Sequence, residues 1–197
     1  MLQYSTIPWI LLVLSNLIGL SLTTILVYLS YRAIKLGEKA FYIQFLSWMC
    51  FTIAQLIEVV HYSSVVASYL YGEIMFLDPF TQRYELMWKS ASFLYLIAFS
   101  GFLTYHLLIK RLGNRMLVFI PLLLTEIEVA VFVVSLGVTL LVFANPDKEL
   151  KSAIGFALLS LSHLAIALEG LYIVEFGLFI AAAFRLLGLS LLLRVVW

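Results

Sequence analysis

Five ionisable residues stand inside long apolar segments of this chain, where they could pair with one another, transfer protons or bind a solute. They are Glu58, Glu126, Glu128, His163 and Arg185. A charged side chain near the centre of a bilayer costs roughly 2.5–3.5 kcal/mol on insertion scales, so it needs a partner, a water-filled cavity or a function. Proton relays and solute sites inside membranes are built from these residue types. These residues therefore define the first candidate site.

The positions of four of these residues predict a buried polar cluster near mid-membrane. Arg185 and Glu126 each lie about eleven residues into their segments from the same side, which gives one depth at about 1.5 Å per residue. Glu128 lies about 3 Å deeper, and His163 about one turn shallower. We expect Arg185 to pair with Glu126 or Glu128, but not with both, because residues two apart on a helix point in nearly opposite directions. The pair would either fix helix packing or serve a proton, quinone or substrate.

Histidines offer possible metal or haem ligands. Glu58 and His61 form an E-x-x-H pair on one helix face, a spacing that suits a metal when a second such pair faces it, and this chain has no second pair. An internally bonded histidine is the simpler interpretation. Haem b would need two axial ligands, and His106 and His163 differ in depth by about 8 Å. Met49 is a conceivable axial ligand, and a haem shared with a neighbouring subunit stays open.

Six apolar segments must position these residues. They cover about 7–31, 40–67, 86–109, 116–144, 152–171 and 174–196, each near the roughly 20 residues that a spanning helix needs. The chain is 64% hydrophobic and 12% charged, more apolar than a soluble domain of 197 residues would be. The sequence therefore predicts an all-α, polytopic membrane helix bundle that forms one transmembrane domain over residues 1–197.

Six alternating crossings would place both chain ends on one side of the membrane, here named side X, with side Y opposite. Lysine and arginine slightly favour side Y, which the positive-inside rule assigns to the cytoplasm. We expect a multi-pass plasma-membrane protein with both ends outside. Residues 40–54 and 153–167 share Ala, Leu-Ser and Ile-Ala at matching offsets. This suggests an inverted 3+3 repeat, or only the shared composition of apolar helices.

Small residues form a ridge on the first segment, where Ser15, Gly19 and Thr23 recur at every fourth position. Such a ridge lets another helix approach closely in a membrane. We expect it either to pack inside the bundle or to dock a partner subunit.

The stretch Leu26–Glu58, LVYLSYRAIKLGEKAFYIQFLSWMCFTIAQLIE, resembles the helix–basic turn–helix opening of small, uncharacterised archaeal polytopic membrane proteins. The resemblance covers about a sixth of the chain and includes no catalytic residue. It implies a prokaryotic plasma membrane and no particular activity.

Composition and motifs narrow the function. A net charge of +1 argues against a nucleic-acid partner, and the one cysteine, Cys50, cannot form an internal disulfide. The sequence contains no P-loop, nucleophile elbow or zinc-protease motif. Besides the lipid bilayer, other membrane subunits are therefore the expected partners.

The function expected first is a non-catalytic accessory subunit of a larger membrane complex, most plausibly a respiratory or other electron-transfer assembly. In that interpretation a buried Glu–Arg pair stabilises the bundle. The alternatives are a small proton-coupled transporter with a Glu/His/Arg site and a membrane electron carrier that binds haem b or quinone. A membrane-embedded enzyme is the remaining alternative.

Overall fold

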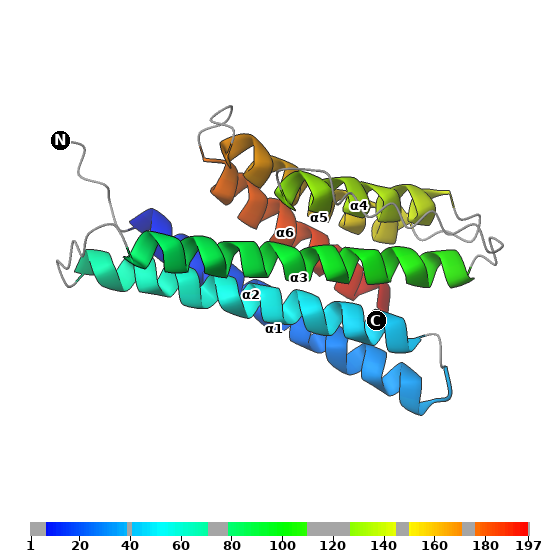
Figure 1. Ribbon diagram of the computed structural model, residues 1–197. Coiled ribbons are helices and arrows are strands. Elements are labelled where there is room, and N and C mark those ends of the chain that lie inside the picture. Colours follow the sequence, from blue (N-terminus) through cyan, green and yellow to red (C-terminus); the bar gives the residue numbers. More distant parts are fainter. Residues whose placement is uncertain are drawn as a thin grey trace.

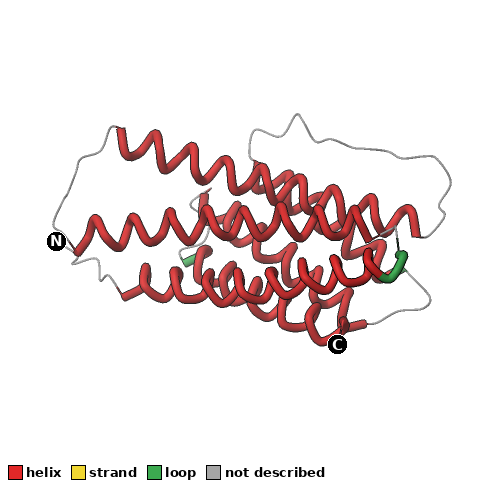
Figure 2. Tube along the Cα trace, turned by 90° about the horizontal axis from the view of Figure 1, so that it is seen from below, coloured by secondary structure: helices red, strands yellow, loops and turns green. Residues whose placement is uncertain are grey.

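The computed structural model describes residues 7–38, 41–70, 79–109, 127–144, 150–170 and 176–196. These residues form six α-helices, and Figure 2 shows that nearly all of the described chain is helical. The helices are α1 (Ile7–Lys35), α2 (Phe41–Leu70), α3 (Pro79–Ile109), α4 (Ile127–Phe143), α5 (Leu150–Gly170) and α6 (Gly177–Val196). The predicted segment 116–144 begins among residues 110–126, which lie outside the described residues, as do Glu126 and Glu175.

Five of these helices are long and apolar enough to cross a membrane, namely α1, α2, α3, α5 and α6. Helix α4 is also apolar, but it has only 17 residues. Large apolar side chains stand exposed on the outside of the bundle, among them Leu11, Ile18, Leu46, Phe93 and Leu187. Exposed apolar surface on this scale is expected of helices that face lipid and not of a monomer that faces water.

The six helices close into a ring. Each helix packs on its neighbour in the chain, and α6 returns to pack on α1 (Figure 1). Helices α5 and α6 approach closely where Gly155 and Gly188 face each other. A Cβ on Gly188 would lie 2.8 Å from the carbonyl oxygen of Gly155, so only glycine permits this crossing. This close crossing holds α6 against α5, and the other side of α6 packs on α1.

Contacts between neighbouring helices fix their directions. Helices α3 and α4 run the same way, because Ser92 bonds Glu128 and Leu103 lies against Gly137 farther along both helices. Helices α4 and α5 run in opposite directions, since α5 meets α4 first through Ser160 and then through His163, in the reverse order of their α4 partners. The described helices α1, α3, α4 and α6 therefore run one way and α2 and α5 the other (Figure 1).

These directions correct the alternating topology expected from the sequence. Helix α1 begins at the end of the bundle that we keep calling the X end, and α6 finishes at the opposite, Y end. The start of α1 and the end of α6 therefore lie at opposite ends of the bundle. The three-helix units α1–α3 and α4–α6 also run in the same direction, which does not fit an inverted repeat. The reason is that α3 ends and α4 begins at opposite ends of the bundle.

An aromatic core fills the half of the bundle toward the Y end. Phe51 and Trp48 of α2 pack against Tyr95 and Phe102 of α3, with ring centroids 4.8 Å and 4.5 Å apart. Phe156 of α5 packs on Phe102 from the other side, with the centroids 5.5 Å apart. These side chains are almost completely buried. The polar residues described below lie between this core and the X end.

Labelling of single cysteines tests the helix directions. In a Cys50→Ser background, Glu38→Cys and Lys151→Cys should react with a membrane-impermeant maleimide from one side, and Glu85→Cys from the other. The alternating topology instead places Lys151 with Glu85. Joint labelling of those two positions in sealed vesicles would contradict the parallel arrangement of α3 and α4.

Candidate functional site

Arg185 forms a buried ion pair with Glu58. The guanidinium lies in the first half of α6, and its Nη1 donates to the carboxylate of Glu58 on α2. The same nitrogen donates to the hydroxyl of Tyr95 at 3.0 Å and reaches the side-chain oxygen of Asn16 at 3.4 Å. Both charged side chains are only 5% exposed. Because an arginine keeps its charge in proteins, this pairing is what makes its burial tolerable.

Glu128 forms a second buried pair, with His163. Its carboxylate lies at the start of α4 and is 2.9 Å from Nδ1 of His163 on α5. The hydroxyl of Ser92 on α3 donates to the other carboxylate oxygen. The His163 side chain is completely buried, and its Nε2 has no hydrogen-bond partner among the described residues. The pair thus combines a carboxylate with an imidazole, which gains and loses a proton near neutral pH more readily than other side chains.

Tyr95 joins the two pairs. Its ring lies 4.9 Å from the ring of His163 in an edge-to-face contact, and the guanidinium carbon of Arg185 lies 4.9 Å from the centre of the same ring. Its hydroxyl accepts from Arg185. We call the connected residues the polar network, which consists of Asn16, Glu58, Ser92, Tyr95, Glu128, His163 and Arg185. All six described helices contribute to it.

The pairing within the network differs from the sequence prediction. Arg185 is bonded to Glu58, whereas the bonds of Glu128 are to Ser92 and His163. The prediction compared depths along helices that were assumed to alternate in direction. It also left Glu58 out of the mid-membrane cluster, although this side chain is buried and bonded to Arg185. The structure does bring Glu128, His163 and Arg185 into one network, while Glu126 lies outside the described residues.

The candidate metal and haem ligands do not converge in the structure. Glu58 faces Arg185, while the ring of His61 packs on Tyr62 and Trp88. No group of three or more His, Cys, Asp or Glu side chains that could hold a metal occurs in the part of the chain that is described.

A haem between His106 and His163 does not fit the packing either. The two rings are separated by stacked phenylalanines of the core, Phe99, Phe102 and Phe156. Met49, the conceivable axial ligand, is 38% exposed and belongs to the outward-facing side chains.

The ridge of small residues packs inside the bundle. Thr23 donates to the side-chain oxygen of Gln55 on α2 at 2.9 Å. A Cβ on Gly19 would lie 2.6 Å from the amide nitrogen of Gln55, so glycine makes room for this side chain. Ser15 bonds the carbonyl of Leu12 in its own helix. The ridge thus brings α1 against α2 and does not form an outward docking face at Gly19 and Thr23.

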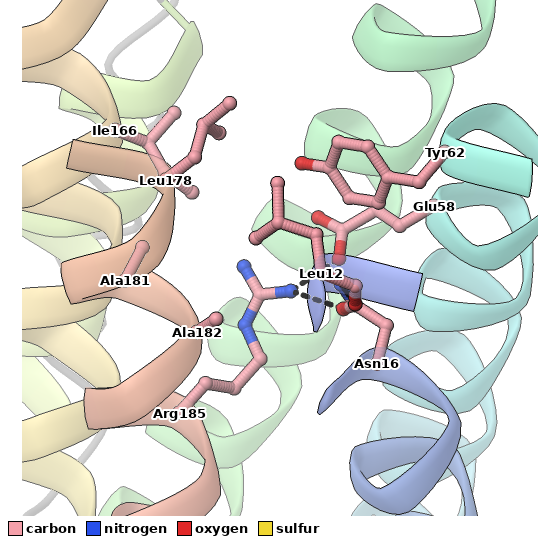
Figure 3. A pocket seen from close by; sticks show the side chains of 9 residues that line it. All are labelled: Leu12, Asn16, Glu58, Tyr62, Ile166, Leu178, Ala181, Ala182 and Arg185. Carbon is pink, nitrogen blue, oxygen red and sulfur yellow. Dashed lines mark hydrogen bonds and ion pairs between the residues drawn. The ribbon is translucent and has the colours of Figure 1, made fainter. Parts of the chain in front are cut away.

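A small cavity lies on the X side of Arg185 (Figure 3). Its volume of about 10 Å³ is close to that needed for a single water molecule. One wall carries Leu12, Asn16, Glu58 and Tyr62, and the opposite wall carries Ile166, Leu178, Ala181 and Ala182, with Arg185 at one end. The cavity is therefore bounded by charge at its inner end and by mostly apolar side chains elsewhere.

Sequence reasoning missed Asn16, Ser92 and Tyr95 as members of the site. A signal was present for two of them. Asn16 is an amide within an apolar segment, and Tyr95 stands in mid-segment, whereas the tyrosines near segment ends are those expected at interfaces. Ser92 gave no such signal, because serine is common where membrane helices pack.

Comparison with protein-family models, curated proteins and solved structures finds no match. The function must therefore be argued from the site itself.

A double-mutant cycle tests the observed pairing. Glu58→Gln or Arg185→Gln alone leaves an uncompensated buried charge, which should cost about 3–5 kcal/mol of unfolding free energy. The double variant should lose less than the sum, with a coupling of about 1–3 kcal/mol, and the cycle of Glu128 with Arg185 should show weaker coupling. Unfolding in detergent micelles measures both cycles.

The exposed pair Glu85–Lys89 provides the control for this cycle. These side chains are 62% and 60% exposed, so Glu85→Gln should change stability by no more than about 1 kcal/mol. Stronger coupling of Arg185 to Glu128 than to Glu58 would refute the assignment of pairs.

Proposed function

We propose that this protein is a small proton-coupled membrane transporter whose central site is the polar network. One observation carries the proposal: two buried ion pairs meet at Tyr95 beside a small, partly open cavity. Two neighbouring pairs, one of which includes a histidine, provide one group that gains and loses a proton and one cation that can bind a solute.

The charges of the network suit a site that changes protonation inside a membrane. Glu58 and Arg185 neutralise each other, and Glu128 shares a hydrogen bond with His163. A proton taken up by His163 is compensated by the carboxylate of Glu128 at 2.9 Å, so the imidazolium needs no bulk water for stabilisation. We therefore assign proton uptake to the Glu128–His163 pair. We assign solute binding to the Glu58–Arg185 pair, which borders the cavity.

The packing of side chains around the polar network supports the proposal that a solute enters from the X end of the bundle. The cavity extends from Arg185 toward the X end, where Leu178 lies at the start of α6. Toward the Y end, Phe51, Phe99 and Phe102 are completely or almost completely buried and leave an apolar barrier. A central site that is closed at one end by packed side chains is the arrangement that alternating access requires.

Basic residues favour a cytoplasmic Y end. Arg32, Lys35, Lys151 and Arg194 stand at this end of the described helices. The basic residues of the described helices at the X end are Arg83 and Lys89, of which Lys89 is paired with Glu85. By the positive-inside rule the start of α1 faces the outside and the end of α6 faces the cytoplasm. A plasma-membrane location and an archaeal source stay predictions from the sequence.

The accessory-subunit function stays a second prediction from the sequence. One of its supports was the ridge on α1, and Gly19 and Thr23 are used against α2 within the bundle. Stoichiometric co-purification with redox subunits in a mild detergent would favour that function over a transporter.

Proton coupling is testable in proteoliposomes loaded with a pH-sensitive dye. A panel of small carboxylates, amino acids, sugars and inorganic ions is added outside, with empty liposomes subtracted to remove passive permeation. At least one solute class should change the internal pH. Glu128→Gln and His163→Gln should slow this change by about tenfold or more, which corresponds to about 1.4 kcal/mol of barrier.

Glu85→Gln is the matched control, because it removes a carboxylate from an exposed pair outside the network. Its rate should equal that of the unmodified protein. Absence of any solute-dependent pH change with folded protein, or equal rates in Glu128→Gln and the unmodified protein, would reject the proposed function.

A further inference from the structure

One edge of the Arg185 guanidinium makes no hydrogen bond within the described residues. The bonds to Asn16, Glu58 and Tyr95 all leave from Nη1. The buried Nε has no partner in the described part of the chain. Nε and Nη2 together form the side edge of the guanidinium, whose two parallel N–H groups match the two oxygens of a carboxylate. Buried donors are normally satisfied, so this edge indicates a further acceptor.

The free edge belongs to a residue that lines the cavity. Figure 3 shows one terminal nitrogen of Arg185 directed to Glu58 and Asn16, and the other pointing into the space between the two walls. Ala181 and Ala182 of α6, which have small side chains, line the cavity together with the guanidinium. A group that enters this space meets two N–H donors at its polar end and apolar side chains elsewhere.

The buried charges determine the condition under which an anion can bind at this edge. Glu58 already neutralises Arg185, so a second anion would add uncompensated negative charge. Uptake of one proton by the Glu128–His163 pair restores the balance, because that proton and the bound carboxylate together add no net charge to the polar network. The proton forms one N–H bond on His163, and the ligand makes a second ionic contact on Arg185 beside that of Glu58.

We infer that the Nε–Nη2 edge of Arg185 binds the carboxylate of a small monocarboxylate with a short apolar tail, which enters from the X end together with one proton. This inference rests on the proposed transport function and names its substrate class. The tail lies against Leu12, Ile166, Leu178 and Ala182. Since the cavity holds about one water molecule in this state, binding opens the walls, and short carboxylates bind better than long ones.

Equilibrium binding tests the site without requiring transport. Sodium propionate is titrated into the detergent-solubilised protein and binding is followed by calorimetry, with sodium chloride and neutral propionamide as controls. Propionate should bind saturably and propionamide should not, because the amide lacks the charge that Arg185 recognises. Hexanoate should bind more weakly than propionate.

Two variants and one matched control locate the site. Ala182→Leu fills the cavity from its α6 wall and should weaken propionate binding by about tenfold or more, whereas Ala183→Leu adds the same side chain at an exposed position and should not. Arg185→Lys keeps the charge opposite Glu58 but lacks the fork of donors, so it should lose propionate binding while the protein stays folded.

The outcomes separate this inference from the proposed function. No saturable propionate binding, or equal binding in Ala182→Leu, Ala183→Leu and Arg185→Lys, would overturn the carboxylate site. If a different solute class drives the pH change in vesicles, transport stands and the carboxylate assignment fails. If propionate binds as expected but no solute moves protons, the binding site stands and the transport function fails.

Discussion

The structure depends on the neutralisation of one buried cation, Arg185. A guanidinium cannot discard its charge by losing a proton, so inside an apolar bundle it must find an anion. Glu58 is that anion, and it stands on the second helix, while Arg185 stands on the sixth. This pair therefore links α6 to α2. Helix α6 also packs on α1. The glycine crossing holds α6 against α5.

The polar network is sensitive to added charge because the surroundings of this pair have low polarity. Electrostatic interactions are stronger where water is excluded, so each proton or ligand that enters must be matched by an opposite change nearby. Toward the Y end, the aromatic core excludes water from the network. Toward the X end, the cavity leaves space beside the Glu58–Arg185 pair. Tyr95 links the pair that faces the cavity to the pair that contains His163. In the proposed transporter, the pair that takes up the proton and the pair that binds the solute are therefore neighbours.

Much of the helical content could be predicted from the sequence, and less of the site. Long apolar runs predicted α1, α2, α5 and α6 to within about four residues at each end, because hydrophobicity and length decide whether a segment suits a membrane. The break between α5 and α6 was also predicted; there Glu169 accepts from the backbone N–H of Leu178 and Phe176 adopts a φ of 71°. The partner of Arg185 was not predicted, because depth along a helix does not specify the direction in which a side chain points.

The sequence by itself determined that the chain forms apolar helices and that a few ionisable residues lie within them. Both properties follow from local composition. Only the tertiary structure decided that α3 and α4 run in parallel, that Glu58 and not Glu128 neutralises Arg185, and that the ridge at Gly19 faces α2. These features depend on how helices far apart in the chain are rotated and directed against one another. Apolar segments constrain that choice weakly, because many of their faces are equally suited to lipid or to a neighbouring helix.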